Sequence, residues 1–343
     1  MSDLPAALGF SVPLVAAPMA GGASTTALVA AAARSGGLGF VPAGYATAQV
    51  LAERIAAART EGITFGVNLF APNPLPVDRE EFGRYARLIQ AEADAYGLDL
   101  TGVAPVEDDD AFAEKIDLLT ADPVPIVSFT FGIPETGVIA TLRRAGSYLI
   151  QTVTSAAEAR AAAEAGVDAL AVQAKAAGAH SGTLSPREPL PDVPIDELIG
   201  RVRRAADLPL IAAGGIATPE DVATVLDAGA AAAMIGTVLL LTDESGASAT
   251  HKAALADPDA RGTVVTHAFT GRPARGLRNR FTDRYSDQAP YGYPALHYLT
   301  TALRKRAAEA GDPGAVHLWA GTGYRHARSE PAEETFARLA AKL

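Results

Sequence analysis

The sequence has no cysteine among its 343 residues, and it has only one tryptophan and three methionines. Without thiols the chain has no disulfide, no thiolate nucleophile and no Cys-ligated metal or cluster. A basic stretch is missing as well, and the formal net charge is −10, so nucleic acid is not an expected partner. The longest apolar runs are alanine-rich and broken by Gly, Asp or Glu, which argues against a membrane span.

The first fifteen residues lack the basic region and long apolar run of a signal peptide. We therefore expect a soluble, cytoplasmic protein. Hydrophobic residues make up 49% of the chain, which is enough to bury a large core. The composition does not fix the oligomeric state, and a homodimer is compatible with it.

Short, nearly all-apolar segments alternate with stretches typical of helices. Eight segments are predicted strands, at 12–18, 37–42, 64–70, 125–132, 147–153, 168–173, 208–215 and 231–237. Such strands are typical of a sheet buried on both faces, and several of the helical stretches begin at Ser, Thr or Pro and end at Gly. Eight strands, each followed by a helix, predict a (β/α)8 TIM barrel. A doubly wound open sheet is the alternative, but no G-x-G-x-x-G follows the first strand.

Two stretches exceed a bare barrel. Residues 72–123 separate the third and fourth strands and hold two helical runs, so we predict a helical insertion there. After the eighth strand come about a hundred residues rich in Arg, Tyr and helical patterns. We therefore predict a barrel over residues 1–242 and a smaller, mainly helical subdomain over 243–343 near the barrel mouth.

The ends of the predicted strands carry glycines and amides rather than acids. Reactive groups of this fold sit at the C-terminal strand ends, and a metal hydrolase would need several His and Asp there. We therefore expect no metal site. The candidate cofactor-binding residues at these ends are Ala17, Pro18, Met19, Asn68, Gln151, Gln173, Gly178, Ala213, Gly214, Gly215, Met234, Ile235, Gly236 and Thr237.

Glycine-bearing loops end the seventh and eighth strands, at 212–221 and 234–237. Loops of this kind, each entering a helix, form the usual phosphate site of the fold, although glycines also simply permit tight turns. The three amides can read a ring with mixed donors and acceptors, or each can be a satisfied buried amide, and the apolar residues 17–19 can lie against a flat ring. This combination favours FMN, although composition alone does not separate FMN from a phosphosugar.

His180 stands among small residues in the loop after the sixth strand, "AKAAGAHSG" (174–182). Small residues let the backbone approach a flat cofactor, and the histidine can then donate a hydrogen bond to an anion or take a proton from an acidic carbon. A loop histidine without a role is the alternative interpretation. The other five histidines lack metal-ligand spacing, and we interpret them as structural; they are His251, His267, His297, His317 and His326.

Motifs that run nearly end to end resemble the nitronate monooxygenase family, formerly called 2-nitropropane dioxygenases. They are "PLVAAPMAGGAS" (13–24), "FGVNLF" (65–70), "VSFTFGIP" (127–134), "QAKAAGAHSG" (173–182), "PLIAAGGI" (209–216), "AAMIGTVLL" (232–240), "FTGRPARGLRNRF" (269–281) and "HLWAGTGY" (317–324). Some of these motifs occur in many flavin and phosphate barrels. The set in this order is specific to the family.

The resemblance implies an FMN-dependent barrel enzyme that oxidises alkyl nitronates with O2 to carbonyl compounds and nitrite, through an anionic flavin semiquinone. Neutral nitroalkanes stay open as a second substrate. Matched position implies that His180 is the base or hydrogen-bond donor of the site. It also implies FMN contacts at Asn68, Gln173, Gly178, Gly215 and residues 234–237. The chain has Ala176, Ala179 and Met234 where the family often has Glu, Gly and Gln, so the choice of substrate stays open.

Other functions fit the same residues. An FMN-dependent NAD(P)H:quinone or enoyl reductase has the same barrel, and a flavin-binding protein without efficient turnover is a second rival. A flavin-free phosphosugar lyase is a third, for which only Lys175 is a candidate at a strand end.

Two further groups of residues lie in the C-terminal segment. Four arginines can help to hold an anion, or, in the interpretation we favour for most of them, pin this segment to acids of the barrel; they are Arg272, Arg275, Arg278 and Arg280. Three tyrosines are either pocket walls or core residues, namely Tyr291, Tyr293 and Tyr298.

Overall fold

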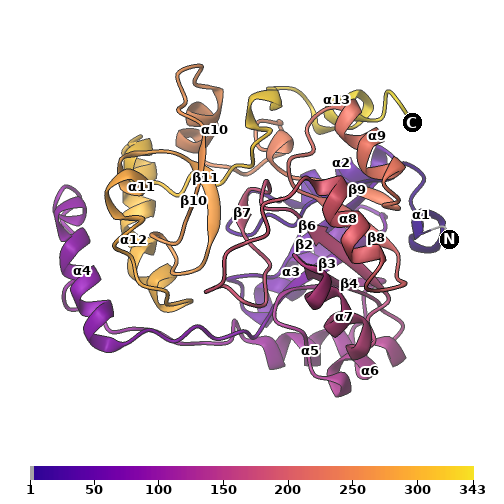
Figure 1. The fold of residues 1–343 in the computed structure, drawn as a ribbon, viewed down its shortest axis with the longest axis horizontal. Coiled ribbons are helices and arrows are strands. Elements are labelled where there is room, and N and C mark those ends of the chain that lie inside the picture. The colour runs from indigo at the N-terminus through magenta and orange to yellow at the C-terminus, as the bar shows by residue number, and fades with distance from the viewer. Residues whose placement is uncertain (1–3) are drawn as a thin grey trace.

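A computed structural model describes residues 4–343. Eight parallel strands close into a barrel in the order β1-β2-β3-β4-β5-β6-β8-β9 (Figure 1). The strands are β1 (Leu14–Ala16), β2 (Leu38–Pro42), β3 (Phe65–Ala71), β4 (Ile126–Phe131), β5 (Tyr148–Val153), β6 (Ala169–Gln173), β8 (Leu210–Ala213) and β9 (Ala232–Ile235). Each predicted strand segment overlaps one of them. The (β/α)8 prediction is therefore confirmed, and the alternative of an open sheet is wrong.

Helices surround this barrel and bury apolar faces against it. They are α2 (Thr26–Arg34), α3 (Ala48–Thr60), α5 (Phe112–Ala121), α6 (Thr136–Arg144), α7 (Ala156–Ala165), α8 (Ile195–Arg203), α9 (Pro219–Asp227) and α13 (Ala332–Leu339). Side-chain oxygens of Thr25, Thr47, Ser155 and Thr218 accept hydrogen bonds from backbone N–H groups in the first turns of α2, α3, α7 and α9. The short helix α1 (Leu4–Leu8) buries Leu4 and Leu8 in a cluster with residues of the strands.

A second layer of structure lies at one side of the barrel, on the left of Figure 1. It consists of α4 (Arg79–Asp94), α10 (Ala249–Ala256), α11 (Arg280–Tyr285), α12 (Ala295–Glu309), β10 (Thr263–Thr266) and β11 (Ala274–Leu277). Three short 3-10 turns complete the chain, namely η1 (Thr237–Leu239), η2 (Pro313–Ala315) and η3 (Tyr324–His326). We call this layer, residues 79–94 and 249–316, the cap.

The cap also contains a small antiparallel sheet that the sequence analysis did not predict. Its order is β10-β11-β7, and β7 (Ala179–His180) comes from the loop after β6. In the β7–β11 pair Ala274 lies opposite His180 and Arg275 opposite Ala179. The barrel loop that carries the candidate histidine is therefore an edge strand of the cap.

The predicted insertion, residues 72–123, contributes one helix to the cap and one helix to the barrel. Helix α4 packs on α12, where Phe82, Tyr85 and Ile89 share a buried cluster with Leu296 and Leu299, and the two helices lie side by side in Figure 1. Helix α5 packs instead between α3 and α6 on the barrel. The C-terminal helix α13 likewise returns to the barrel and packs against α2 and α9. The domain boundaries stay a prediction, because contacts cross both of them.

Within residues 4–343, no helix combines the length and the apolar character that crossing a bilayer would require.

Candidate active site

His180 is held at the barrel mouth by its own backbone. It pairs with Ala274 across the β7–β11 ladder, and its carbonyl oxygen accepts a hydrogen bond from Gln173 Nε2 at 3.1 Å. The other end of the same amide, Gln173 Oε1, accepts from the N–H of Gly182 at 2.7 Å. Gln173 therefore braces both sides of the histidine within the loop. Its predicted contact with a cofactor stays a prediction.

The imidazole of His180 lies among three aromatic rings. The ring centroids of Phe131, Tyr293 and Trp319 are 5.7, 5.6 and 5.6 Å from that of His180. Its Nε2 atom lies 2.9 Å from Thr270 Oγ1. The β7–β11 pairing and Gln173 thus fix the backbone of His180, and Thr270 fixes its ring. A catalytic side chain needs support of this kind.

Two residues at this site adopt backbone conformations that side chains rarely take. Phe131, at the end of β4, has a φ of 82°, and Ala179, just before the histidine, has a φ of 62°. Strained non-glycine residues of this kind gather at functional sites, because the surrounding structure must hold them there. Ala179 stands where the family resemblance predicts glycine, so this chain keeps the left-handed turn with a less suitable residue.

The electrostatic surroundings keep the His180 imidazole neutral. Burial lowers the pKa of His180 to about 3, and the positive charges of Arg272 and Arg304 lower it further in the same direction. At neutral pH the ring therefore carries no charge. It can accept a proton at one nitrogen or donate a hydrogen bond from the other, but it brings no positive charge to an anion.

The positive charge at the site comes from buried arginines instead. The Arg272 side chain is 0% exposed; its Nη2 donates to the carbonyl oxygen of Thr183, and its Cζ lies 4.1 Å from the centroid of the Phe131 ring. Its Nε and Nη1 have no hydrogen-bond partner within residues 4–343. Burial lowers the pKa of Arg272 to about 10, so it stays charged at neutral pH. A buried cation without a carboxylate produces a strong local attraction for anions.

The favoured interpretation of the arginines, ion pairs that pin the C-terminal segment to acids of the predicted barrel unit, holds for Arg280, which reaches Glu92 in the predicted insertion, and not for the other three. Among residues 4–343 Arg272 has no acidic partner, and Arg275 donates to the carbonyl oxygen of Lys175 and to Thr263. Arg278 and Arg280 do form ion pairs, but with acids of the cap and its neighbouring turn, namely Asp283, Glu92 and Asp312. Arg280 therefore ties α11 to α4 and to the turn before η2.

The predicted phosphate loops lie on adjacent strands. Ala213 at the end of β8 is in register with Met234 of β9, and Gly214 and Gly215 have φ values of 107° and 82°, which favour glycine strongly. A third loop follows β1 and lies against them. In this loop the N–H of Ala17 donates to the carbonyl oxygen of Ile235 at 2.8 Å. The structure thus brings together the loops that contain residues 17–19, 213–215 and 234–237.

Close approaches of backbone at this place explain two more of the predicted glycines. A Cβ on Gly236 would lie 3.3 Å from Ala17 Cβ and 3.7 Å from the sulfur of Met19, and one on Gly178 would lie 2.5 Å from the backbone nitrogen of Gly321. The Gly321 N–H also donates to Thr237 Oγ1 at 2.9 Å. The loop 320–323 therefore closes over the predicted phosphate loops.

The sequence analysis missed that loop as part of the candidate site. Thr322 N–H donates to the carbonyl oxygen of Ala176, and Gly321 lies against both Gly178 and Thr237. The available signal was the paired glycine motif "AGTGY", which resembles the glycine loops at the strand ends. It lies far along the chain from those strands, so its position had to come from the fold.

Each of the two other predicted amides, Asn68 and Gln151, has a side-chain oxygen without a hydrogen-bond partner within residues 4–343. Asn68 donates from Nδ2 to Ser128 Oγ and Thr130 Oγ1, at 2.9 and 3.1 Å, and its Oδ1 accepts no hydrogen bond within residues 4–343. Gln151 is 0% exposed, and its Oε1 is a buried acceptor without a partner in the described chain. Both amides therefore have an acceptor available to a donor supplied by a ligand.

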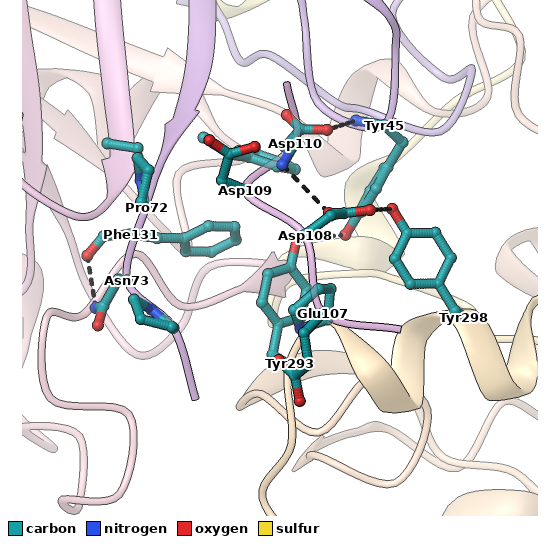
Figure 2. A pocket seen from close by; sticks show the side chains of 14 residues that line it. Tyr45, Pro72, Asn73, Glu107, Asp108, Asp109, Asp110, Phe131, Tyr293 and Tyr298 are labelled. Carbon is teal, nitrogen blue, oxygen red and sulfur yellow. Dashed lines mark hydrogen bonds between the residues drawn. The ribbon is translucent and has the colours of Figure 1, made fainter. Parts of the chain in front are cut away.

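A cavity lies next to the aromatic residues that surround the histidine, and His180 is not among the residues that line it. Figure 2 shows its lining side chains. Its volume is about 320 Å³, and Phe131 and Tyr293 line it with one side while they contact His180 with another. Its remaining wall includes Tyr45, Phe70, Tyr298 and the acidic run Glu107–Asp110. None of the predicted cofactor-binding residues lines it.

Of the three tyrosines predicted as pocket walls or core residues, two line this cavity and one does not. Tyr293 and Tyr298 line the cavity, and Tyr298 Oη donates to Asp108 at 2.6 Å. Tyr291 does not line it and stacks on His267, with ring centroids 4.4 Å apart. His297, predicted to be structural, stacks on Tyr45 at 4.0 Å, behind the cavity wall.

No group of three or more metal-ligating side chains within residues 4–343 has the geometry to hold a metal ion. The site is instead made of glycine loops, free amide acceptors, aromatic rings, one neutral histidine and buried arginines.

Known proteins match this chain over its full length. A sequence profile described as nitronate monooxygenase matches residues 6–341. A probable nitronate monooxygenase of Staphylococcus aureus (strain Newman) is 34% identical over 337 residues, which cover 97% of this chain and 94% of that protein.

Solved structures show the same relationship. A nitroalkane oxidase from Streptomyces ansochromogenes is 45% identical and superimposes with a TM-score of 0.93, over 100% of this chain and 98% of that one. FabK from Thermotoga maritima has a TM-score of 0.77 over 100% and 96% of the two chains, but at 24% identity it shows a common fold alone. The chain therefore belongs to the nitronate monooxygenase family, whose members are flavin-dependent oxidoreductases.

Proposed function

We propose that this protein binds FMN at the barrel mouth and oxidises alkyl nitronates with O2 to a carbonyl compound and nitrite. Family membership supports the oxidation of nitro compounds. The observation that carries the proposal is the neutral His180 together with the buried guanidinium of Arg272, whose Nε and Nη1 have no hydrogen-bond partner within residues 4–343, because an anionic substrate fits these two groups.

The residues at the strand ends fit FMN. Gly214, Gly215, Gly236 and Thr237 would hold its phosphate, since backbone N–H groups at adjacent strand ends suit an anion and a Cβ would crowd them. The ring would lie near residues 17–19, with the acceptor atoms of Asn68 and Gln151 free for its N–H groups. When bound, FMN supplies electron transfer from the substrate to oxygen, which no side chain here can provide.

The protein's own residues bind the substrate and keep it dry. Arg272 and Arg304 supply the positive potential that holds a nitronate, because neither has a carboxylate partner within residues 4–343. Phe131, Tyr293 and Trp319 surround the imidazole and exclude water, so the attraction acts in a medium of low polarity. His180 would either take a proton from the α-carbon of the substrate or donate a hydrogen bond to its nitro group.

Steady-state assays with the purified protein test the proposal. Ethyl nitronate or propyl-2-nitronate should cause oxygen consumption matched by nitrite release, and the supernatant of denatured protein should contain FMN. Consumption of NADH or NADPH with a quinone or an enoyl thioester, without nitrite from nitronates, would replace the proposal with the reductase function. A protein without bound flavin that cannot be loaded with FMN would refute the cofactor assignment.

A further inference from the structure

We propose that Glu158 is a positioning residue for the oxidation: it sets the orientation of Arg272 through the Thr183 carbonyl and so controls the affinity for the anionic substrate. The inference rests on the proposed function and adds to it a residue that acts through others. Glu158 lies in the first turn of α7, on the barrel, and it is only 7% exposed. A buried carboxylate needs hydrogen-bond partners, and here these partners connect the helix to the anion site.

The carboxylate of Glu158 accepts hydrogen bonds from two segments of the chain. Its Oε2 accepts from the N–H and from the hydroxyl of Thr154, just before the N-cap of α7. Its Oε1 accepts from Thr183 Oγ1 at 2.9 Å and from the N–H of Leu184 at 2.8 Å. Two carboxylate oxygens have about four lone pairs, so these donors use the whole acceptor capacity of the group. Glu158 therefore ties the start of α7 to the loop after His180.

A single peptide group connects this tie to the arginine. The carbonyl of Thr183 and the N–H of Leu184 belong to the same planar, trans peptide bond, so they point in opposite directions. Glu158 holds the N–H end, and Arg272 Nη2 donates to the carbonyl end. The two hydrogen bonds polarise each other through the peptide group, so each strengthens the other. The carboxylate therefore fixes the direction of the bond that Arg272 makes and also strengthens it.

That bond decides where the free donors of the guanidinium point. The Phe131 ring lies against the Cζ atom of Arg272 at 4.1 Å, and the Thr183 carbonyl holds Nη2. Nε and Nη1 make no hydrogen bond within residues 4–343, so they are the donors left for an anion. A guanidinium donates in fixed directions, and a shift of the Thr183 carbonyl would therefore turn these donors away from the substrate.

Glu158 does not cancel the positive charge that holds the anion. A neutral peptide group stands between the carboxylate and the guanidinium, and within residues 4–343 no ion pair joins the two side chains. Burial lowers the pKa of Arg272 to about 10, and the attraction of Glu158 only partly opposes this effect. The guanidinium therefore stays available to a substrate anion, and the contribution of Glu158 is geometric.

The substitution Glu158→Asp tests the geometry without changing the charge. The carboxylate becomes one methylene shorter, so it keeps a place beside Thr154 and loses its reach to the loop. We expect KM for ethyl nitronate to rise about three- to tenfold and kcat to change less than about twofold, because the anion is held less well before and during the reaction.

Glu164→Asp is the matched control, since Glu164 lies exposed in the same helix. It should change either constant less than about twofold. An unchanged KM in Glu158→Asp would overturn the proposal.

A double-mutant cycle separates positioning from general damage to the fold. In Arg272→Met there is no guanidinium to orient, so adding Glu158→Asp should raise KM by less than about twofold more. The same rise in both backgrounds would show that Glu158 is only structural and would overturn the proposal.

Thr183→Val tests the same tie from its other end, should Glu158→Asp not fold. It removes the hydroxyl that donates to Oε1, so KM should rise about two- to fivefold, and Thr183→Ser should restore the wild-type value. Equal KM values in the wild type, Thr183→Val and Thr183→Ser would contradict the role of Glu158.

Calorimetric titration with nitrate, a planar anion with oxygen atoms like those of a nitronate, gives a result that does not depend on turnover. Glu158→Asp should raise the Kd of nitrate about three- to tenfold in the wild-type background and less than about twofold in Arg272→Met. A protein that shows this shift but releases no nitrite from ethyl nitronate would refute the proposed function and leave the positioning role in place. A protein that oxidises ethyl nitronate, with KM and Kd unchanged in Glu158→Asp, would refute the positioning role alone.

Discussion

Phe131 and Tyr293 form a wall between two regions with different electrostatic properties. On one side lie His180 and the buried cation of Arg272; on the other lies a cavity of about 320 Å³ with the acidic run Glu107–Asp110 at its rim. The cavity is the more conspicuous feature, but its acids would repel an anion. The side with little space has the neutral imidazole of His180 and the positive charge of Arg272. Chemistry, rather than volume, locates the candidate site.

The largest difference between the two sides of the wall is expected from the substitution His180→Gln. It removes the base from the first side of the wall, so kcat/KM for nitroethane should fall by about 10²–10⁴. The matched control on the cavity side is Tyr298→Phe, which removes one hydrogen bond to Asp108 and should change kcat/KM less than about threefold. Nitrite release measures both. Similar losses in the two variants would mean that the sides do not differ in function.

The second change removes the charge and keeps the bulk. Arg272→Met should raise KM for ethyl nitronate by about 10- to 100-fold, because a charged hydrogen-bond donor to the anion is lost. Thermal stability should stay level or rise, since a buried charge without a carboxylate is removed.

Asp109→Asn on the cavity rim is the control for charge, and KM should change less than about threefold there. An unchanged KM in Arg272→Met would show that the buried guanidinium does not hold the substrate.

The third change alters the predicted phosphate loops. A Cβ on Gly178 would overlap the backbone of Gly321, so Gly178→Ala should cost about 1–3 kcal/mol and lower the flavin content of the purified protein. Gly137→Ala lies in helix α6 with no atom within 4 Å of the new Cβ, and it should stabilise the protein by up to about 1 kcal/mol. Thermal unfolding and the ratio of flavin to protein absorbance measure both. Full flavin content in Gly178→Ala would separate this loop from the cofactor.

The smallest expected effect is that of pH. The pKa of His180 is lowered to about 3 by burial and by Arg272 and Arg304, so the base is already unprotonated at every pH above about 4. The kcat/KM for nitroethane should therefore show no inflection near 6.5 and stay within about twofold between pH 8 and 5. A fall with a midpoint near 6.5 would show that the ring is more solvated than its neighbours allow.

The barrel could be predicted from the sequence because its strands are continuous apolar runs, and such runs do not depend on a partner far along the chain. The glycine loops at the strand ends followed from the same topology, which places all C-terminal ends at one mouth. The small sheet of the cap could not be predicted. β7 has two residues, and β10 and β11 have four each, too few for an alternating pattern to stand out.

The surroundings of His180 depend on contacts between distant segments. Thr270 follows it by 90 residues, and Trp319 and Arg304 come later still, so no spacing could indicate that they meet. Arg272 was found as one of four arginines, but its burial without an acid is a property of the fold. The identity of the candidate base was predictable, whereas its protonation state was not.

An anaerobic titration of the purified protein with ethyl nitronate tests the central claim most directly, with visible absorption of the bound flavin as the signal and His180→Gln and Arg272→Met alongside. We expect nitronate to change the wild-type flavin spectrum and air to restore it with release of nitrite. We also expect Arg272→Met to need a higher nitronate concentration for the same change. A wild-type spectrum that does not respond to nitronate but is bleached by NADH or NADPH would contradict the proposed oxidation of nitronates and favour a reductase.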